Sequence, residues 1–111
     1  MVTEKPFLRS HALIHEIAEI DVIEGHEAAF EAAVAQAAPH FKAARGCRSL
    51  ALNRSVENPQ RYRLVVGWDT VEDHMVYFRE SEAFQIWRGL VGPHFAAPPR
   101  VEHLTTVIDG F

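Results

Sequence analysis

Apolar and polar residues alternate along four segments of the chain, and apolar residues recur every three or four positions in the stretches between them. A period of two is typical of strands with one buried face. It predicts strands at residues 12–23, 47–55, 61–69 and 100–108. A period of three to four is typical of amphipathic helices. It predicts one helix at residues 27–44 and a second helical region in two pieces. The first piece begins at Thr70, and the second begins at Ser81 and ends at Gly92.

The second helical region is expected to turn one largely apolar face toward the sheet. That face consists of Val71, His74, Met75 and Phe78 in the first piece and Phe84, Trp87 and Val91 in the second. Thr70 is a favourable N-cap residue, and the acidic residues that follow it suit the first turn of a helix.

Three residues stand out against these patterns. Glu16 breaks the apolar face of the first strand. Pro39 stands inside the first helix, where a proline costs about 3 kcal/mol, so a kink or a fresh helical turn is expected near residues 36–39. Gly46 is expected to take the left-handed conformation that stops this helix.

The element order is strand, helix, strand, strand, helix in two pieces, strand. It predicts an α+β fold of the ferredoxin-like split βαβ type, with a four-stranded antiparallel sheet and the helices on one face. We expect one domain at residues 12–108, preceded by a loose N-terminal leader at residues 1–11. The other sheet face mixes apolar with polar residues, so we expect a second copy of the chain to cover it in a homodimer.

Composition narrows the classes of function. The net charge is −4 without a basic cluster, so a nucleic-acid partner is not expected. The apolar runs are too short to span a membrane. A lone cysteine, Cys47, and a start without a signal-like apolar run favour the reducing cytoplasm.

The histidines do not predict a metal site. His11 and His15 share a strand face but lie about 13 Å apart at strand rise, too far to chelate one ion. No His-x-x-x-His falls on a predicted helix, and no acidic cluster joins the histidines, so no metal ligand is expected. Glycine-rich phosphate loops and a Gly-x-Ser-x-Gly motif are also missing from the sequence.

An aromatic cluster is the strongest candidate for a site. Trp68, His74, Phe78, Phe84 and Trp87 are expected to converge between the sheet and the second helical region. One interpretation is a plain aromatic core. The other is a small-molecule pocket lined by aromatic rings, with His74 as its titratable group.

These residues belong to an ordered set that resembles the antibiotic biosynthesis monooxygenase domain over residues 12–108. The set comprises Gly46-Cys47 before the predicted hairpin, Trp68 at a strand end, Glu72-x-His74 and Ser81-x-x-Phe84. The resemblance implies a dimeric α/β barrel. It also implies a pocket between sheet and helices, where some members oxygenate quinols or polyketide-like aromatics without a cofactor. Other members degrade haem or isomerise small phosphorylated sugars.

Haem degradation is disfavoured. The haem-degrading relatives use an Asn on the first strand and a His on the last helix, positions that hold Ala18 and Arg88 in this chain. We therefore expect a cofactor-independent monooxygenase acting on a small aromatic substrate. A non-catalytic dimeric binding or regulatory protein and an isomerase-like relative remain as alternatives.

For the monooxygenase, each candidate residue has an expected role. His74 is the candidate base or proton shuttle. Trp68 is expected to form one wall of the substrate pocket and to donate a hydrogen bond from its indole N–H. Substrate contacts are expected from Phe78, Phe84 and Trp87, with Tyr62 and Asn53 as weaker donors and Arg88 as a partner for an anionic group. Arg88 could instead be a solvated residue of the helix surface.

Overall fold

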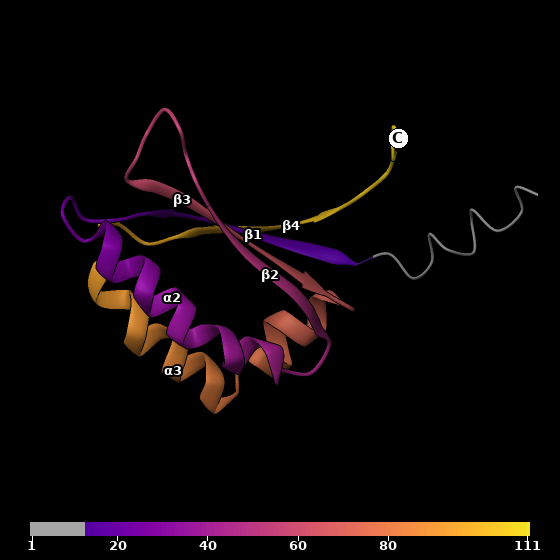
Figure 1. Ribbon diagram of the computed structural model, residues 1–111. Coiled ribbons are helices and arrows are strands. Elements are labelled where there is room, and N and C mark those ends of the chain that lie inside the picture. Colours follow the sequence, from indigo (N-terminus) through magenta and orange to yellow (C-terminus); the bar gives the residue numbers. More distant parts are fainter. Residues whose placement is uncertain (1–12) are drawn as a thin grey trace, which may run out of the picture.

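The computed structural model describes residues 13–111 (Figure 1). Residues 1–12, with the predicted leader and Ala12, lie outside the described residues. The elements follow the predicted order. They are β1 (Ile14–Asp21), α2 (Glu27–Lys42), β2 (Cys47–Arg54), β3 (Arg61–Trp68), the π-helix η1 (Asp73–Phe78), α3 (Glu82–Val91), the 3₁₀ turn η2 (Gly92–His94) and β4 (Arg100–Thr105).

The four strands form one sheet in the order β2-β3-β1-β4, and every neighbouring pair is antiparallel. Figure 1 shows α2 and α3 together on one side of this sheet. The predicted ferredoxin-like α+β fold is confirmed. In the register of the central strand β1, Ala18 lies between Leu64 of β3 and Val101 of β4.

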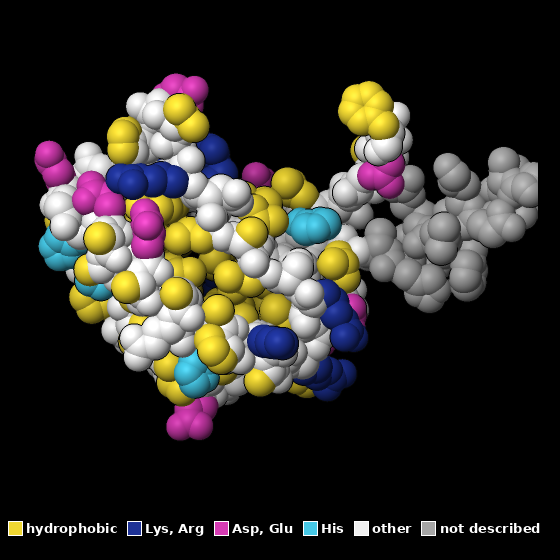
Figure 2. All heavy atoms as spheres, viewed as in Figure 1, with side chains coloured by type: hydrophobic (Ala, Val, Ile, Leu, Met, Phe, Trp, Pro, Cys, Tyr) yellow, Lys and Arg dark blue, Asp and Glu magenta, His cyan; other side chains and the backbone are white. Residues whose placement is uncertain are grey.

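The core lies between the sheet and the helices, where the strand alternation places its apolar side chains. Its buried residues are Ala18 and Ile20 of β1, Val22 just after it, Tyr62, Leu64, Val66 and Trp68 of β3, Phe30, Ala33, Val34, Ala37 and Phe41 of α2, Phe78 of η1, and Trp87 and Val91 of α3. Burying each large apolar side chain stabilises the fold by roughly 2 kcal/mol. In the view of Figure 2, hydrophobic side chains gather in the hollow between the sheet and the helices.

At the end of α2, one of the two predicted outcomes at Pro39 is wrong. It continues through Pro39 to Lys42, and the fresh turn expected at residues 36–39 is not formed. Pro39 falls in the last turn, so little helix follows the hydrogen bond that it removes. Gly46 has the predicted left-handed conformation, with φ +74°, but the helix has already ended, and Gly46 instead shapes the turn into β2.

The second helical region begins as predicted. The Thr70 hydroxyl accepts a hydrogen bond from the Asp73 N–H at 3.0 Å. Residues 73–78 then form a π-helix, in which the Arg79 N–H reaches back to the His74 carbonyl at 3.2 Å. Bonds from i to i+5 were not predicted, and such segments are frequent at functional sites.

The wider turn changes which residues face the sheet. His74 and Phe78 are buried as predicted, but Val71 and Met75 are exposed, and Asp73 is buried in their place. The prediction for Val71 and Met75 was wrong because it assumed 3.6 residues per turn, and a π-helix takes more.

Asp73 anchors the start of η1 against the turn at Gly46. A Cβ atom at Gly46 would overlap the Asp73 carboxyl group, whereas a Cβ at Gly25 would meet nothing within 4 Å. Arg45 pairs with the same carboxylate at 3.3 Å. The placement of η1, and with it His74, therefore depends on a glycine at position 46.

We predict that Gly46→Ala is far more destabilising than Gly25→Ala. Both glycines have positive φ, so each substitution carries a backbone penalty of about 1 kcal/mol. Gly46→Ala adds the clash with Asp73 and should lower the free energy of unfolding by about 3 kcal/mol in total. Urea unfolding of the two variants measures the difference, and equal losses would contradict the Gly46–Asp73 contact.

Candidate active site

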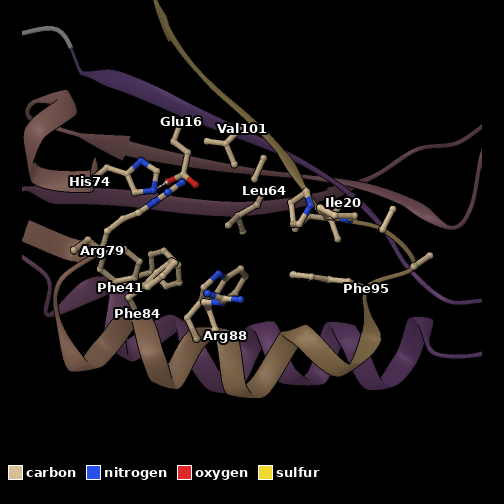
Figure 3. A pocket seen from close by; sticks show the side chains of 17 residues that line it. Glu16, Ile20, Phe41, Leu64, His74, Arg79, Phe84, Arg88, Phe95 and Val101 are labelled. Atoms are coloured by element: carbon tan, nitrogen blue, oxygen red, sulfur yellow. Dashed lines mark ion pairs between the residues drawn. The ribbon is translucent and has the colours of Figure 1, made fainter. Parts of the chain in front are cut away.

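A cavity of about 550 Å³ lies between the sheet and α3 (Figure 3). Cavities of roughly 300–1,000 Å³ are typical of small-molecule sites. Its lining includes Glu16, Ala18 and Ile20 of β1, Leu64 of β3, Val101 of β4, and His74, Phe78, Phe84, Trp87 and Arg88 from the second helical region. Trp68, Phe78 and Trp87 belong to the buried core, as the core interpretation expected, while His74, Phe78, Phe84 and Trp87 also line this cavity.

The aromatic wall contains three of the predicted residues and two others. Phe78, Phe84 and Trp87 line the cavity as expected, joined by Phe41 of α2 and Phe95 after η2. Ring centroids lie 4.7 Å apart for Phe41 and Phe78, and 5.0 Å apart for Phe41 and Trp87. These contacts make a rigid apolar wall suited to a flat ring.

Trp68 supports the site from behind its wall. It is fully buried and stacks on His74, with ring centroids 5.3 Å apart and an interplanar angle of 21°. Its indole N–H donates a hydrogen bond to Oε1 of Glu16 at 2.9 Å. Because that donor is already used, Trp68 orients Glu16, and the expected bond from Trp68 to a substrate oxygen has no free N–H.

Three titratable side chains are in contact: Glu16 and His74, which line the cavity, and His103, which contacts His74 without lining it. Nε2 of His74 lies 3.4 Å from Oε1 of Glu16, the dashed contact in Figure 3, and its Nδ1 lies 2.9 Å from Nε2 of His103. Glu16 and His103 are direct partners in the β1–β4 register. The sheet therefore pairs these two residues, and η1 places His74 against both.

The environment shifts the pKa of each member. Burial raises the pKa of Glu16 to about 7, although the Trp68 hydrogen bond and the Arg79 charge oppose the rise. Burial, with the His103 and Arg79 charges, lowers the pKa of His74 to about 4. Burial and Arg79 also lower the pKa of His103. Near neutral pH, His74 is uncharged and Glu16 is poised between its two forms, so their contact is not an ion pair.

Two arginines bring positive charge to the cavity. Arg79 extends toward the Glu16 carboxyl group in Figure 3, and Arg88 projects from α3 into the same space. Their guanidinium groups lie 5.7 and 5.9 Å from the centroid of the Phe84 ring. An anionic group on a bound molecule would meet both charges. Arg88 is exposed, as the surface interpretation expected, and it also lines the cavity.

Two predicted donors lie elsewhere. Asn53 is exposed on the opposite sheet face, with its amide 3.4 Å from the Arg63 carbonyl. Tyr62 is buried against α2, where its hydroxyl donates to Glu31 at 2.6 Å. Burial and Glu31 raise the pKa of Tyr62 to about 12. Neither residue lines the cavity, so the structure does not bring them to the site.

Sequence reasoning missed Glu16, His103 and Arg79. Glu16 did leave a signal, because an acidic residue broke an otherwise apolar strand face. His103 left none without the β1–β4 register. The first half of the chain also contributes to the cavity, because β1 and α2 supply Glu16 and Phe41.

Within residues 13–111, no group of three or more His, Cys, Asp or Glu side chains is arranged to hold a metal ion. None of the helices in this range is long and apolar enough to cross a membrane.

The fold and the cavity define a ferredoxin-like α+β domain with a small-molecule-sized pocket between sheet and helices. The sequence model of the antibiotic biosynthesis monooxygenase family matches residues 13–90, and the chain belongs to that family. The uncharacterised protein YczJ of Bacillus subtilis (strain 168) is 36% identical over 95 residues, which cover 86% of this chain and 100% of YczJ.

Solved structures agree with this membership. A Bordetella bronchiseptica protein, provisionally called an antibiotic biosynthesis monooxygenase, is 59% identical with a TM-score of 0.86, covering 87% of this chain and 99% of its own. A Nitrosomonas europaea protein with the same provisional description has a TM-score of 0.76, covering 87% and 92%. At 18% identity, the second likeness supports the fold alone.

Proposed function

We propose that the protein is a cofactor-independent monooxygenase that oxidises a small hydroxylated aromatic substrate, such as a quinol or a polyketide-like phenol. One observation carries the proposal: a carboxyl group with a pKa of about 7, Glu16, faces an aromatic-walled cavity. A general base works best when its pKa lies near the working pH. With its lowered pKa, His74 is a weak base, so Glu16 takes the role first assigned to His74, and His74 serves as the proton shuttle.

The proposed reaction balances without an added reductant. Glu16 removes the proton of a phenolic hydroxyl, and the electron-rich anion supplies electrons to O₂. A ring carbon that carried hydrogen forms a bond to one oxygen atom, the O–O bond breaks, and that carbon becomes a carbonyl. The other oxygen atom leaves as water with two protons. One phenol and one O₂ thus yield one quinone and one water.

The cavity also suggests the charge of the substrate. Its apolar wall suits a flat ring, and Arg79 and Arg88 suit an anionic substituent or the phenolate itself. Because the site has one poised carboxyl and two fixed positive charges, a carboxylated phenol is a better fit than a neutral one.

Oxygen consumption by chelator-treated protein tests the function. A panel of hydroquinones, naphthols and anthrones, each with and without a carboxylate, should include a substrate that drives O₂ uptake. His74→Ala and Trp68→Phe should each reduce that uptake, since the first removes the shuttle and the second removes the donor that orients Glu16. Aromatic ligands that shift the melting temperature without any O₂ uptake would favour a binding protein and overturn this proposal.

We also propose that the protein is a homodimer in the cytoplasm, with its outer sheet face against a second copy. That face carries Ile17 and Val65, which are register partners. Beyond β4 a C-terminal arm projects from the body and ends in hydrophobic side chains (Figures 1 and 2). Val107 and Ile108 in this arm are 80% and 79% exposed, so a partner surface would explain them.

Light scattering at micromolar concentration should give twice the 12.5 kDa chain mass. Substituting Asp for both Val107 and Ile108 should weaken the dimer, because the arm would then place charges in an apolar interface. The same double change in the exposed hairpin turn, at Val56 and Pro59, is the matched control. A monomeric mass for the unaltered protein would contradict the dimer.

A further inference from the structure

We propose that His103 is the outlet of a proton relay that runs from Glu16 through His74 to solvent. The inference rests on the proposed function and adds a residue of β4 to its site. Glu16 and His74 are buried, with 5% and 3% of their surface exposed, and both line the cavity, so a substrate that fills the cavity leaves neither a direct path to bulk water. His103 is half-buried on β4, which is an edge strand of the sheet. It is therefore the member of the chain that reaches water.

The contacts run in one line. Glu16 touches one nitrogen of His74, and His103 touches the other, at 3.4 and 2.9 Å. An imidazole with one partner at each nitrogen can accept a proton on one side while releasing a proton from the other. Two partners would also satisfy the two ring nitrogens of a purely structural histidine. The feature that favours a relay is that the second partner, His103, lies nearer to solvent.

The proton steps balance over one catalytic cycle. Before the substrate reacts, a protonated Glu16 carboxyl gives its proton to Nε2 of His74, whose own proton then lies on Nδ1. At the same time Nδ1 of His74 releases its proton to Nε2 of His103, and His103 loses a proton from Nδ1 to water. Glu16 is then a carboxylate and the His74 proton lies on Nε2. The carboxylate takes the phenolic proton and passes it to the departing oxygen atom. The reverse of the relay protonates Glu16 from water and restores the starting tautomers.

One nearby charge, that of Arg79, disfavours the protonated form of every member of the relay. Arg79, in the turn after η1, acts on all three members: it lowers the pKa of Glu16, His74 and His103. Trp68 of β3 contributes a neutral donor to Glu16. Because Arg79 disfavours a positive charge on either ring, a proton does not rest on the imidazoles.

Nitrogen-15 NMR of the histidine rings tests the relay without any substrate. When Glu16 is protonated it donates to Nε2 of His74, so the His74 proton lies on Nδ1. When Glu16 ionises, the His74 proton should move to Nε2. We expect this tautomer switch near pH 7 in the unaltered protein and its disappearance in Glu16→Gln. A His74 tautomer that is constant from pH 5 to 9 would overturn the relay, whether or not the protein consumes O₂.

Kinetics then test the outlet. His103→Gln retains a hydrogen-bond partner for His74 but cannot titrate, and it should slow turnover about tenfold, a share of the usual acid–base contribution. Added imidazole should restore turnover in His103→Ala, because the small molecule can occupy the vacated space. His40→Gln, on α2 away from this cavity, is the matched control and should leave turnover unchanged.

The two proposals fail separately. A tautomer switch in a protein that oxidises no substrate would support the relay and refute the monooxygenase. Full turnover in His103→Gln, or no rescue of His103→Ala by imidazole, would refute His103 as the outlet while leaving the monooxygenase in place.

Discussion

Glu16→Gln should reduce O₂-dependent turnover by about 100-fold or more, while the protein still folds and still binds aromatic ligands. Glutamine has nearly the shape of glutamate, and its carbonyl can still accept the Trp68 indole N–H now held at 2.9 Å. It cannot accept a proton from a phenol. The loss should therefore appear in kcat, with a smaller effect on KM, because the apolar wall and the arginines remain.

The pH profile gives this prediction a second readout. In the unaltered protein, turnover should rise through pH 7 as Glu16 ionises, since only the carboxylate can act as base. In Glu16→Gln that rise should be missing. Glu57→Gln, an exposed carboxylate in the turn between β2 and β3, controls for loss of negative charge. A Glu16→Gln protein with unaltered turnover would require another base.

Most of the fold could be predicted because its signals are local. Alternation along 12–23, 47–55, 61–69 and 100–108 depends on neighbouring residues, and the confirmed strands fall within those bounds. The π-helix could not be predicted in this way. Its wider turn accompanies the packing of Asp73 against Gly46, a tertiary contact that no periodicity encodes.

Some residues of the candidate site could be predicted from local sequence patterns, and others could not. His74, Phe78, Phe84, Trp87 and Arg88 were predicted from one helical region, and they line the cavity together. Glu16 and His103 come from strands near opposite ends of the chain, and only the β1–β4 register makes them neighbours. The sequence predicted that Trp68 lies near the site. It did not predict that the Trp68 indole N–H donates to Glu16, because Glu16 itself was not recognised as a site residue.

The buried position of Glu16 suits its proposed function but lowers the stability of the fold. An acidic residue on the core face of β1 interrupts an apolar surface, and burial strongly disfavours its charged form. Proteins tolerate such local conflicts chiefly at functional sites. If the carboxyl is retained for its chemistry, removing its charge should make the protein more stable wherever Glu16 would otherwise be ionised.

The second large prediction is therefore a gain in stability from Glu16→Gln that appears only at higher pH. The pKa of Glu16 rises from 4.5 in the unfolded chain to about 7 in the fold. The folded state thus holds the proton more tightly, and the free energy of unfolding falls as pH rises from about 4.5 to about 7. A shift of this size corresponds to about 3 kcal/mol. Glu16→Gln should be more stable than the unaltered protein by about that amount at pH 8, and by much less at pH 4.5.

Urea unfolding of both proteins from pH 4.5 to 8 measures this difference. His74 changes stability in the opposite direction. Its pKa falls from 6.5 in the unfolded chain to about 4 in the fold, so the free energy of unfolding decreases as pH decreases through that range. Because His74 contacts Glu16, its contribution does not simply cancel between the two proteins. Above about pH 6.5 His74 is uncharged in the folded state and largely uncharged in the unfolded state, so the difference between the proteins from pH 6.5 to 8 isolates Glu16. Together the two groups place the stability optimum of the unaltered protein in mildly acidic solution. A difference between the two proteins that does not change with pH would mean that Glu16 is not held in a proton-retaining environment, and the assignment of Glu16 as the base would lose its physical ground.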